Sequence, residues 1–288
     1  MAAPLGLVAG GGRMPLRVAD AAVKSGRPLF CVLLDGFADP AEYAAYPHEV
    51  VALGRIGHMV GLMRIRGISD LVLAGRVTRP SLLRFRFDAE GVKLVAKLGR
   101  AALFGGDDRL LSAMLRVMRE EGFRPLGAQE VLDDLLVEGG VLGAVAPTDD
   151  DRADIARGIA VTRALGTADV GQGCVVQQGL VLGVEAIEGT DALLARCGTL
   201  RREGPGGVLV KLVKPRQDVR ADLPVIGPDT VREAAVAGLA GIAIEARAGH
   251  AGTLVVDRAE TISEADAAGL FLVAIRPDEF LSQQEQMT

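Results

Sequence analysis

Short apolar segments that recur along the first half of the chain constrain its fold more than any other feature. These segments are Leu5–Ala9, Leu29–Leu34, Val50–Leu53 and Asp70–Gly75. Strands that are apolar along their whole length are typical of parallel sheets buried on both faces. Between them the apolar residues have helical spacing, as in Ile56–Arg66, which fits helices covering such a sheet. The first half therefore predicts a Rossmann-like α/β domain.

The second half of the chain has a different order of elements. Cys174–Gln177 and Leu180–Ala186 flank Gln178-Gly179, a pair typical of a hairpin turn. Strand-like and helical segments then alternate up to Ile275, and Pro277–Thr288 is expected to be a frayed tail. We therefore expect two α/β domains with an active-site cleft between them. The N-terminal Rossmann-like domain would span residues 1–137, a glycine-rich linker 138–148, and a C-terminal mixed α/β domain 149–288.

Composition narrows the class of protein. A chain of 288 residues with 49% hydrophobic and 24% charged residues is globular and long enough for about two domains. Its formal charge of −5 argues against a nucleic-acid binder. Cys31, Cys174 and Cys197 are widely spaced, so we expect buried reduced thiols. No apolar segment has the length of a membrane span and Met1–Gly12 lacks a signal-peptide pattern, so a cytoplasmic location is expected.

Glycines follow two of the expected strands, as Gly10-Gly11-Gly12 and as Gly75 before Arg76. Ligands of doubly wound sheets bind outside the carboxyl ends of the strands, and a glycine loop before a helix can hold a phosphate. However, Pro15 stands where the dinucleotide-binding fingerprint has its last glycine, and no Walker lysine follows. Two interpretations stay open, namely a phosphate or nucleotide site and a tight structural turn.

A loop rich in charges of both signs follows the apolar strand Val208–Val213. It contains Lys214, Arg216, Gln217, Asp218, Arg220 and Asp222. A solvated connector is the simpler interpretation, but loops placed by a rigid scaffold often carry function. Lysine and arginine neutralise phosphate oxygens, and carboxylates suit Mg²⁺. The loop therefore predicts an anion site with a metal ion.

Acidic residues gather at the end of another expected strand, where Glu185, Glu188 and Asp191 surround Thr190. Thr190 is expected to cap the helix that follows. The chain has no nucleophile elbow, no HExxH segment and no Ser/His/Asp arrangement, so neither a covalent nor a zinc mechanism has support. Cleavage of a phosphoanhydride requires neutralised phosphate charge and a water aimed in line. The residues thus indicate a two-domain protein that handles phosphate groups.

Seven motifs spread over the chain extend this interpretation. They are LGLVAGGGRMPL at Leu5–Leu16, GFADP at Gly36–Pro40, GDDRLL at Gly106–Leu111, ADIARGI at Ala153–Ile159, DVGQG at Asp169–Gly173, VLGVEAIEGTDALL at Val181–Leu194 and KPRQDVRADLPVIG at Lys214–Gly227. With them the chain resembles, over nearly its whole length, the Mg²⁺-dependent UDP-2,3-diacylglucosamine pyrophosphatases of lipid A biosynthesis. The family meant is the type that is not a calcineurin-like phosphoesterase.

The resemblance implies hydrolysis of UDP-2,3-diacylglucosamine to 2,3-diacylglucosamine 1-phosphate and UMP. It matches Asp222 to the essential aspartate of the family, as a Mg²⁺ ligand or as the group that orients the attacking water. Asp191 is the second candidate metal ligand. Candidates for holding the uridine, the diphosphate and the sugar are Gly10, Gly11, Gly12, Gly75, Arg76, Gln172, Glu188, Thr190, Lys214, Gln217 and Arg220.

The acyl chains of such a substrate would need an apolar trough, so peripheral contact with the inner membrane is expected, and a homodimer stays open. The first alternative is a non-catalytic protein that binds a nucleotide sugar without Mg²⁺-dependent turnover. The second, a nicotinamide-dependent oxidoreductase, is disfavoured by Pro15 and by Asp35, which is too isolated as a candidate for holding the ribose.

Overall fold

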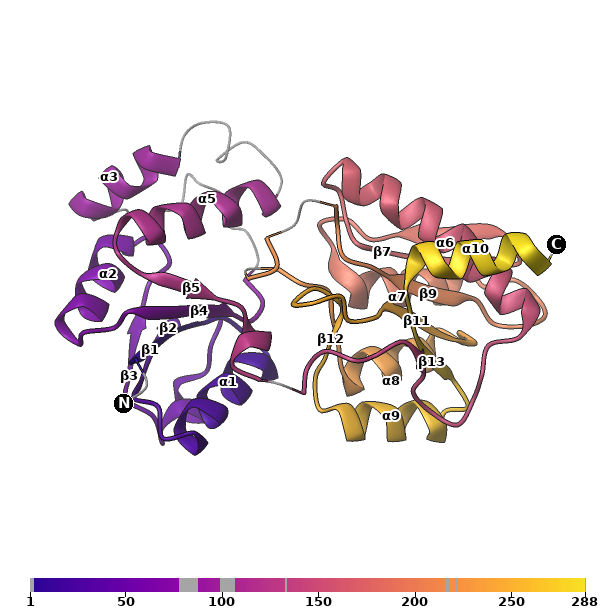
Figure 1. The fold of residues 1–288 in the computed structure, drawn as a ribbon, viewed down its shortest axis with the longest axis horizontal. Coiled ribbons are helices and arrows are strands. Elements are labelled where there is room, and N and C mark those ends of the chain that lie inside the picture. Colours follow the sequence, from indigo (N-terminus) through magenta and orange to yellow (C-terminus); the bar gives the residue numbers. More distant parts are fainter. Residues whose placement is uncertain are drawn as a thin grey trace. The chain divides into compact units, whose positions relative to one another are not determined.

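The computed structural model describes residues 3–77, 88–98, 107–132, 134–215, 218–220 and 222–287. The chain divides into two compact units, each of which is described by itself (Figure 1). Unit 1 consists of Met1–Asp133 and Asp218–Asp222, and unit 2 of Asp134–Gln217 and Leu223–Thr288. The short segment Asp218–Asp222 therefore groups with residues that precede it by more than 80 positions.

Unit 1 is built on a five-stranded parallel sheet in the order β3-β2-β1-β4-β5. Its strands are β1 (Leu5–Ala9), β2 (Leu29–Leu34), β3 (His48–Val51), β4 (Asp70–Ala74) and β5 (Arg124–Leu126). Because β1 lies between β2 and β4, the chain order reverses at the β1/β4 pair, which makes this pair a topological switch point.

Helices cover both faces of this sheet (Figure 1). On one face α1 (Arg13–Lys24) buries Val18, Ala19 and Ala22 against β1 and β2. On the other face α2 (Ile56–Ile65), α3 (Ala89–Leu98) and α5 (Asp107–Glu120) share one apolar core with alternate residues of β2. The short helices η1 (Pro40–Tyr43) and η3 (Ala128–Glu130) complete the described part of the unit.

Unit 2 contains a six-stranded mixed sheet in the order β6-β13-β11-β9-β7-β8. Its strands are β6 (Gly140–Val141), β7 (Gly173–Gln177), β8 (Leu180–Val184), β9 (Val208–Lys211), β11 (Gly241–Glu245) and β13 (Phe271–Ile275). The central strands β9, β11 and β13 are parallel, whereas β6, β7 and β8 pair antiparallel. A second, two-stranded sheet pairs β10 (Val225–Ile226) with β12 (Leu254–Val255).

Two groups of helices enclose the mixed sheet. On one face α6 (Asp149–Thr167) and α10 (Pro277–Met287) share a core with Val210 and Phe271. On the other face α7 (Gly189–Thr199), α8 (Pro228–Val236) and α9 (Arg258–Ala267) pack in a row. Gly158 of α6 lies directly over β9, since an added Cβ would be 2.3 Å from Val210 Cγ2.

Most expected elements are present, and the exceptions have physical reasons. Gln178 and Gly179 both have positive φ, 51° and 76°, which confirms the hairpin turn between β7 and β8. The expected frayed tail is wrong, because α10 buries Phe280 against the core that α6 shares. Within residues 138–148, the expected linker, β6 pairs with β13 and forms an edge of the mixed sheet.

Candidate functional site

The two glycine segments of unit 1 lie against each other at the carboxyl ends of β1 and β4. Gly10 N donates to Ala74 O at 2.8 Å, Gly11 N donates to Arg76 O at 2.9 Å, and Arg76 N donates to Gly11 O at 2.8 Å. A Cβ on Gly10 would be 2.6 Å from Arg76 O, and one on Gly75 would be 2.7 Å from Gly10 C. Close backbone approach therefore requires glycine here, and the N–H groups of Gly10 and Gly11 are already used within the protein.

Gly12 differs from its neighbours. It has a φ of 93°, immediately precedes α1, and an added Cβ would meet nothing within 4 Å. The first turn of a helix carries backbone N–H groups without intrahelical partners and the positive end of the helix dipole. Gly12 is thus the member of this loop that combines open space, a helix start and the switch point of the sheet.

Val219 and Arg220 form a turn after Asp218, and the Asp218 carboxylate holds this turn. Arg220 donates to the carboxylate from its backbone N at 3.2 Å, from Nε at 2.8 Å and from Nη2 at 2.6 Å. Asp222 N donates to Asp218 O at 3.4 Å. The hydrogen bonds from Arg220 lower the pKa of Asp218, and Arg119 adds positive charge 4.0 Å away. The guanidinium of Arg220, expected on the diphosphate, thus shapes the turn in which half-buried Asp222 lies.

Gln129 of η3 holds this turn from the side of β5. Its Nε2 donates to Val219 O at 2.8 Å, and the residue is only 7% exposed. Gly127 makes room for it, because a Cβ there would be 2.3 Å from Gln129 Oε1. No motif or charge pattern surrounds Gln129, and its contact joins positions 90 residues apart. Sequence reasoning therefore had no signal by which to find it.

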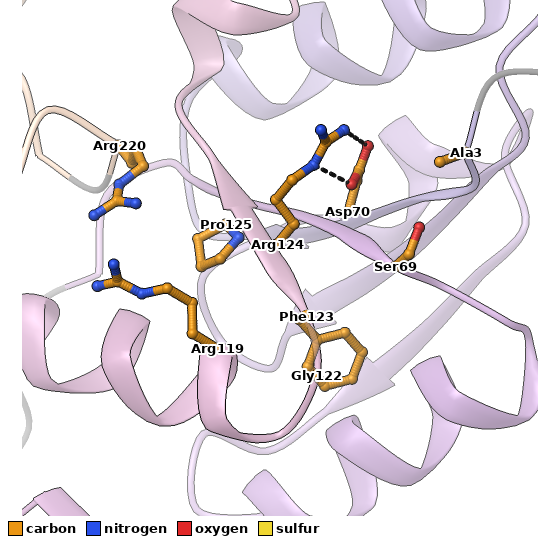
Figure 2. A pocket seen from close by; sticks show the side chains of 9 residues that line it. All are labelled: Ala3, Ser69, Asp70, Arg119, Gly122, Phe123, Arg124, Pro125 and Arg220. Carbon is orange, nitrogen blue, oxygen red and sulfur yellow. Dashed lines mark hydrogen bonds and ion pairs between the residues drawn. The ribbon is translucent and has the colours of Figure 1, made fainter.

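A pocket of about 540 Å³ opens in unit 1 near the amino ends of β4 and β5 (Figure 2). Arg220 lines it together with Arg119 and Arg124. Arg124 donates to the buried Asp70 carboxylate from Nε at 2.7 Å and from Nη2 at 2.6 Å. Arg27 also pairs with Asp70. Carboxylates already pair with Arg124 and Arg220. The positive charge that lines this pocket beside the turn is therefore partly neutralised.

In unit 2 a buried ion pair lies where β8 and β9 end. Lys211 Nζ is 3.6 Å from Glu185 Oε1, and the hydroxyl of Thr190 bridges them. It donates to Glu185 Oε1 at 2.6 Å and accepts from Lys211 Nζ. The prediction that Thr190 caps the helix is therefore wrong. Helix α7 begins at Gly189, one residue before Thr190, and Glu188 is its N-cap. The sequence pointed to Glu185 only as part of an acidic group, and to Lys211 as a cation of opposite charge to that group.

The remaining candidates in unit 2 also have partners in the protein. Lys214 Nζ is 3.3 Å from Asp169 Oδ1, and Glu188 Oε1 is 3.0 Å from Arg196. Gln172 O accepts from the backbone N of Leu212 at 3.0 Å. Buried carboxylate oxygens without a hydrogen-bond partner in the described part of the chain include Asp169 Oδ2 and Glu185 Oε2.

The structure divides the expected site between its two units. Unit 1 contains the glycine segments, Arg76, Arg220 and Asp222, whereas Gln172, Glu188, Thr190, Asp191 and Lys214 belong to unit 2. Gln217 lies outside the described residues. The two candidate metal ligands, Asp222 and Asp191, fall in different units, and no group of three His, Cys, Asp or Glu residues able to hold a metal ion occurs among the residues described.

Fold and site together define a two-unit α/β protein with its charged candidate residues at strand ends and in one short turn. Comparison with known proteins gives the family. The model of the LpxI N-terminal domain matches residues 4–135, and that of the LpxI C-terminal domain matches residues 138–273. The chain belongs to the LpxI family.

A curated relative covers nearly the whole chain. It is the UDP-2,3-diacylglucosamine pyrophosphatase LpxI of Caulobacter vibrioides, 43% identical over 282 residues, which are 96% of this chain and 98% of the relative. Among solved structures, an NAD-dependent epimerase/dehydratase candidate from Methylobacillus flagellatus aligns with 100% of this chain and 82% of its own, at 11% identity. Its TM-score of 0.33 is too low to support any argument. Within the described residues, no helix is both long and apolar enough to cross a membrane.

Proposed function

We propose that this protein hydrolyses the diphosphate of UDP-2,3-diacylglucosamine to 2,3-diacylglucosamine 1-phosphate and UMP in lipid A biosynthesis. The observation that carries the proposal is the match to the Caulobacter pyrophosphatase, 43% identical over 96% of the chain. Both family models of the chain, one for each half, point to the same family. That the substrate lies in a cleft between two domains stays a prediction.

Unit 1 is proposed as a Rossmann-like domain that holds the uridine nucleotide. The strand order β3-β2-β1-β4-β5 supports this role, because ligands of such sheets bind at the carboxyl ends of the strands beside the switch point. The start of α1 at Gly12, with Gly75 and Arg76 beside it, is the proposed place for the nucleotide phosphate. Gly10 and Gly11 serve by allowing the two loops to meet, since their N–H groups bond to Ala74 and Arg76.

A magnesium ion is the proposed cofactor, with Asp222 and Asp191 as its candidate protein ligands. The residues present fit a Mg²⁺ ion, which is held in many phosphate-processing sites by one or two carboxylates together with waters and substrate phosphates. Such binding needs no cluster of three ligating side chains, and none occurs in the described part of the chain. When bound, the ion would neutralise charge that develops on the phosphate oxygens.

The chain's own residues would position the reacting groups. Asp222 orients the attacking water or ligates the metal, because a carboxylate in a braced turn keeps a fixed direction. Lys214 and Gln217 hold the diphosphate, with Arg220 contributing the guanidinium N–H groups that Asp218 leaves unused. Gln172, Glu188 and Thr190 lie in unit 2 as the sugar side of the site, where the unpartnered Glu185 Oε2 can accept a hydroxyl donor.

The deciding experiment measures UMP release from UDP-2,3-diacylglucosamine with Mg²⁺ and with EDTA, for the wild type, Asp222→Ala and Asp222→Asn. We expect Mg²⁺-dependent turnover that falls by a factor of about 10³ or more in both variants, which would correspond to the loss of a group acting in the transition state. Binding of the substrate without turnover in the wild type would instead indicate a non-catalytic nucleotide-sugar-binding protein. Turnover that survives both substitutions would retain the enzyme and remove Asp222 from its site.

Three further expectations accompany the proposal: a cytoplasmic location, peripheral contact with the inner membrane, and a homodimer. Ile187 supports the second, because it is 94% exposed in the loop between β8 and α7, next to Glu188. An exposed isoleucine beside the proposed sugar side offers apolar surface to an acyl chain. All three stay predictions.

A further inference from the structure

Gln129 is a buried amide whose hydrogen bond reaches the turn that carries Asp222. It belongs to η3, directly after the edge strand β5, and its Nε2 donates to Val219 O at 2.8 Å. The residue is 7% exposed. Val219 precedes Asp222 by three residues, within a turn that is closed by the hydrogen bond from Asp222 N to Asp218 O. A shift at Val219 therefore moves Asp222 as well.

The short helix η3 does not need this amide for its own structure. Its cap is formed by the neighbouring Glu130, whose Oε1 accepts from Gly127 N at 2.8 Å. The backbone of η3 is also closed by hydrogen bonds from Glu130 N to Gly127 O and from Val131 N to Ala128 O, both at 3.0 Å. The Gln129 side chain instead contacts the turn, at Val219 O.

Contacts inside the turn fix its shape but not its place. Asp218 binds the backbone and the guanidinium of Arg220, so these residues move together. Among the described residues, the contacts that tie the turn to the rest of unit 1 include Gln129 to Val219 O and Arg119 to Asp218 at 4.0 Å. The first is a short hydrogen bond from a side chain that is 7% exposed, whereas Arg119 is 45% exposed and its distance is that of a loose ion pair.

We propose that Gln129 is a positioning residue of this enzyme: its side-chain amide fixes the carbonyl of Val219 and thereby the direction of the Asp222 carboxylate. The inference rests on the proposed function, in which Asp222 acts on the water or the metal. It assigns to Gln129 no contact with the substrate. Its effect on the reaction runs through geometry, and small errors in the placement of a reacting group reduce rates strongly.

The test compares Gln129→Met with Gln177→Met. Gln177 is a matched control, since it is 0% exposed and its Nε2 donates to Pro205 O at 2.6 Å and to Arg202 O at 3.1 Å, in a loop of unit 2 that carries none of the candidate residues. Both substitutions keep a side chain of similar size. Gln129→Met removes the hydrogen bond to Val219 O, whereas Gln177→Met removes three hydrogen bonds to its loop, so the control loses more polar contacts than the test variant. Gln129→Glu, which keeps the length and polarity of the side chain, provides a second variant in case Gln129→Met fails to fold.

Two readouts separate positioning from folding. Hydrogen–deuterium exchange of the peptide spanning 213–223 should speed up in both Gln129 variants and stay as in the wild type in Gln177→Met. In steady-state UMP release, kcat should fall by about 10- to 100-fold in the Gln129 variants with KM within about threefold, whereas Gln177→Met should keep both constants within about threefold.

Several results would overturn the inference. Unchanged exchange in the Gln129 variants would mean that the amide does not hold the turn. Faster exchange with unchanged kcat would mean that the direction of Asp222 does not depend on it. An equal loss of kcat in Gln177→Met would mean that both substitutions lower kcat by destabilising the fold, and not by moving Asp222. A wild type without turnover would contradict the proposed function and the catalytic part of the inference. Faster exchange in the Gln129 variants would then still support the structural part, namely that the amide of Gln129 holds the Val219 carbonyl.

Discussion

At the scale of single residues, unit 1 is stabilised by a carboxylate at the start of a central strand. Asp70 is 2% exposed and accepts hydrogen bonds from Arg124 and Arg27. Burial alone would raise the pKa of Asp70, but the hydrogen bonds and charges of Arg124 and Arg27 outweigh it and lower the pKa. Burying a carboxylate lowers the free energy of unfolding little as long as both arginine partners are present, and much more when one of them is removed.

Asp70→Asn should destabilise the protein by about 2 kcal/mol at pH 7, because it removes the charge from these hydrogen bonds. The folded pKa of Asp70 lies below its unfolded value of about 3.9, so this stabilisation is complete above pH 4 and is lost as the pH falls through the folded pKa. Urea unfolding of the wild type and the variant from pH 7 to pH 3 checks both statements. The difference in unfolding free energy should shrink only below about pH 4.

Asp229→Asn is the control for this prediction, since its ion pair with Arg232 lies on the surface with Asp229 72% exposed. Asp229→Asn should change the free energy of unfolding by less than about 0.5 kcal/mol. Equal effects of the two substitutions would show that burial of Asp70 contributes nothing beyond an ordinary surface pair.

At the scale of elements, the distance between a helix and its sheet depends on glycine at some positions and not at others. Gly158 of α6 has Val210 Cγ2 within 2.3 Å of the position of an added Cβ, whereas Gly61 of α2 has nothing within 4 Å. Both glycines lie inside helices, where alanine is the better helix former by about 1 kcal/mol. The same substitution should therefore have opposite signs at the two positions.

Gly61→Ala should raise the melting temperature by about 1–4 °C, because it removes backbone freedom from the unfolded chain without a clash. Gly158→Ala should lower it by several degrees, since β9 and α6 must separate and overpacking costs about 1–3 kcal/mol. Differential scanning calorimetry of the two variants measures both effects. A stabilised Gly158→Ala would contradict the close approach of α6 to the sheet.

At the scale of the whole molecule, the proposed magnesium ion should matter for the reaction and not for the fold. Each unit has apolar cores of its own, and the described residues contain no three-ligand cluster that a metal ion could hold together. A cation held by one or two carboxylates and by substrate oxygens binds weakly without substrate. It then adds little to the free energy of unfolding, which rises with the ratio of free ligand to its Kd.

EDTA should therefore abolish UMP release while changing the melting temperature by less than about 1 °C. Thermal melting in EDTA and in Mg²⁺, with turnover measured on the same samples, tests this separation. Adding UMP together with Mg²⁺ should raise the melting temperature of the wild type more than that of Asp222→Ala. A large shift with Mg²⁺ alone would point to a structural metal site instead.

The sequence by itself determined most of the strands and the main loops, although the short strands β5, β6 and β10 were not predicted and β3 begins two residues earlier than expected. The apolar runs Leu5–Ala9 and Leu29–Leu34 coincide with β1 and β2, and the Gln178-Gly179 turn joins β7 to β8, because these signals lie within a few neighbouring residues. Motifs that span the chain likewise sufficed for the family, which the two domain models confirm. Asp222 and the glycines were noticed for the same local reason.

Only the tertiary structure decided which of these residues touch. Gly10 meets Ala74, Lys211 meets Thr190, and Gln129 meets Val219 across 90 positions. The tertiary structure also explains why the expected tail is the helix α10. Phe280 is buried only when α6 and the sheet are in place to contact it. Such contacts form between distant parts of the chain when strands pair and helices pack. Their free energy depends on that packing, and the spacing of residues along the sequence carries no record of it.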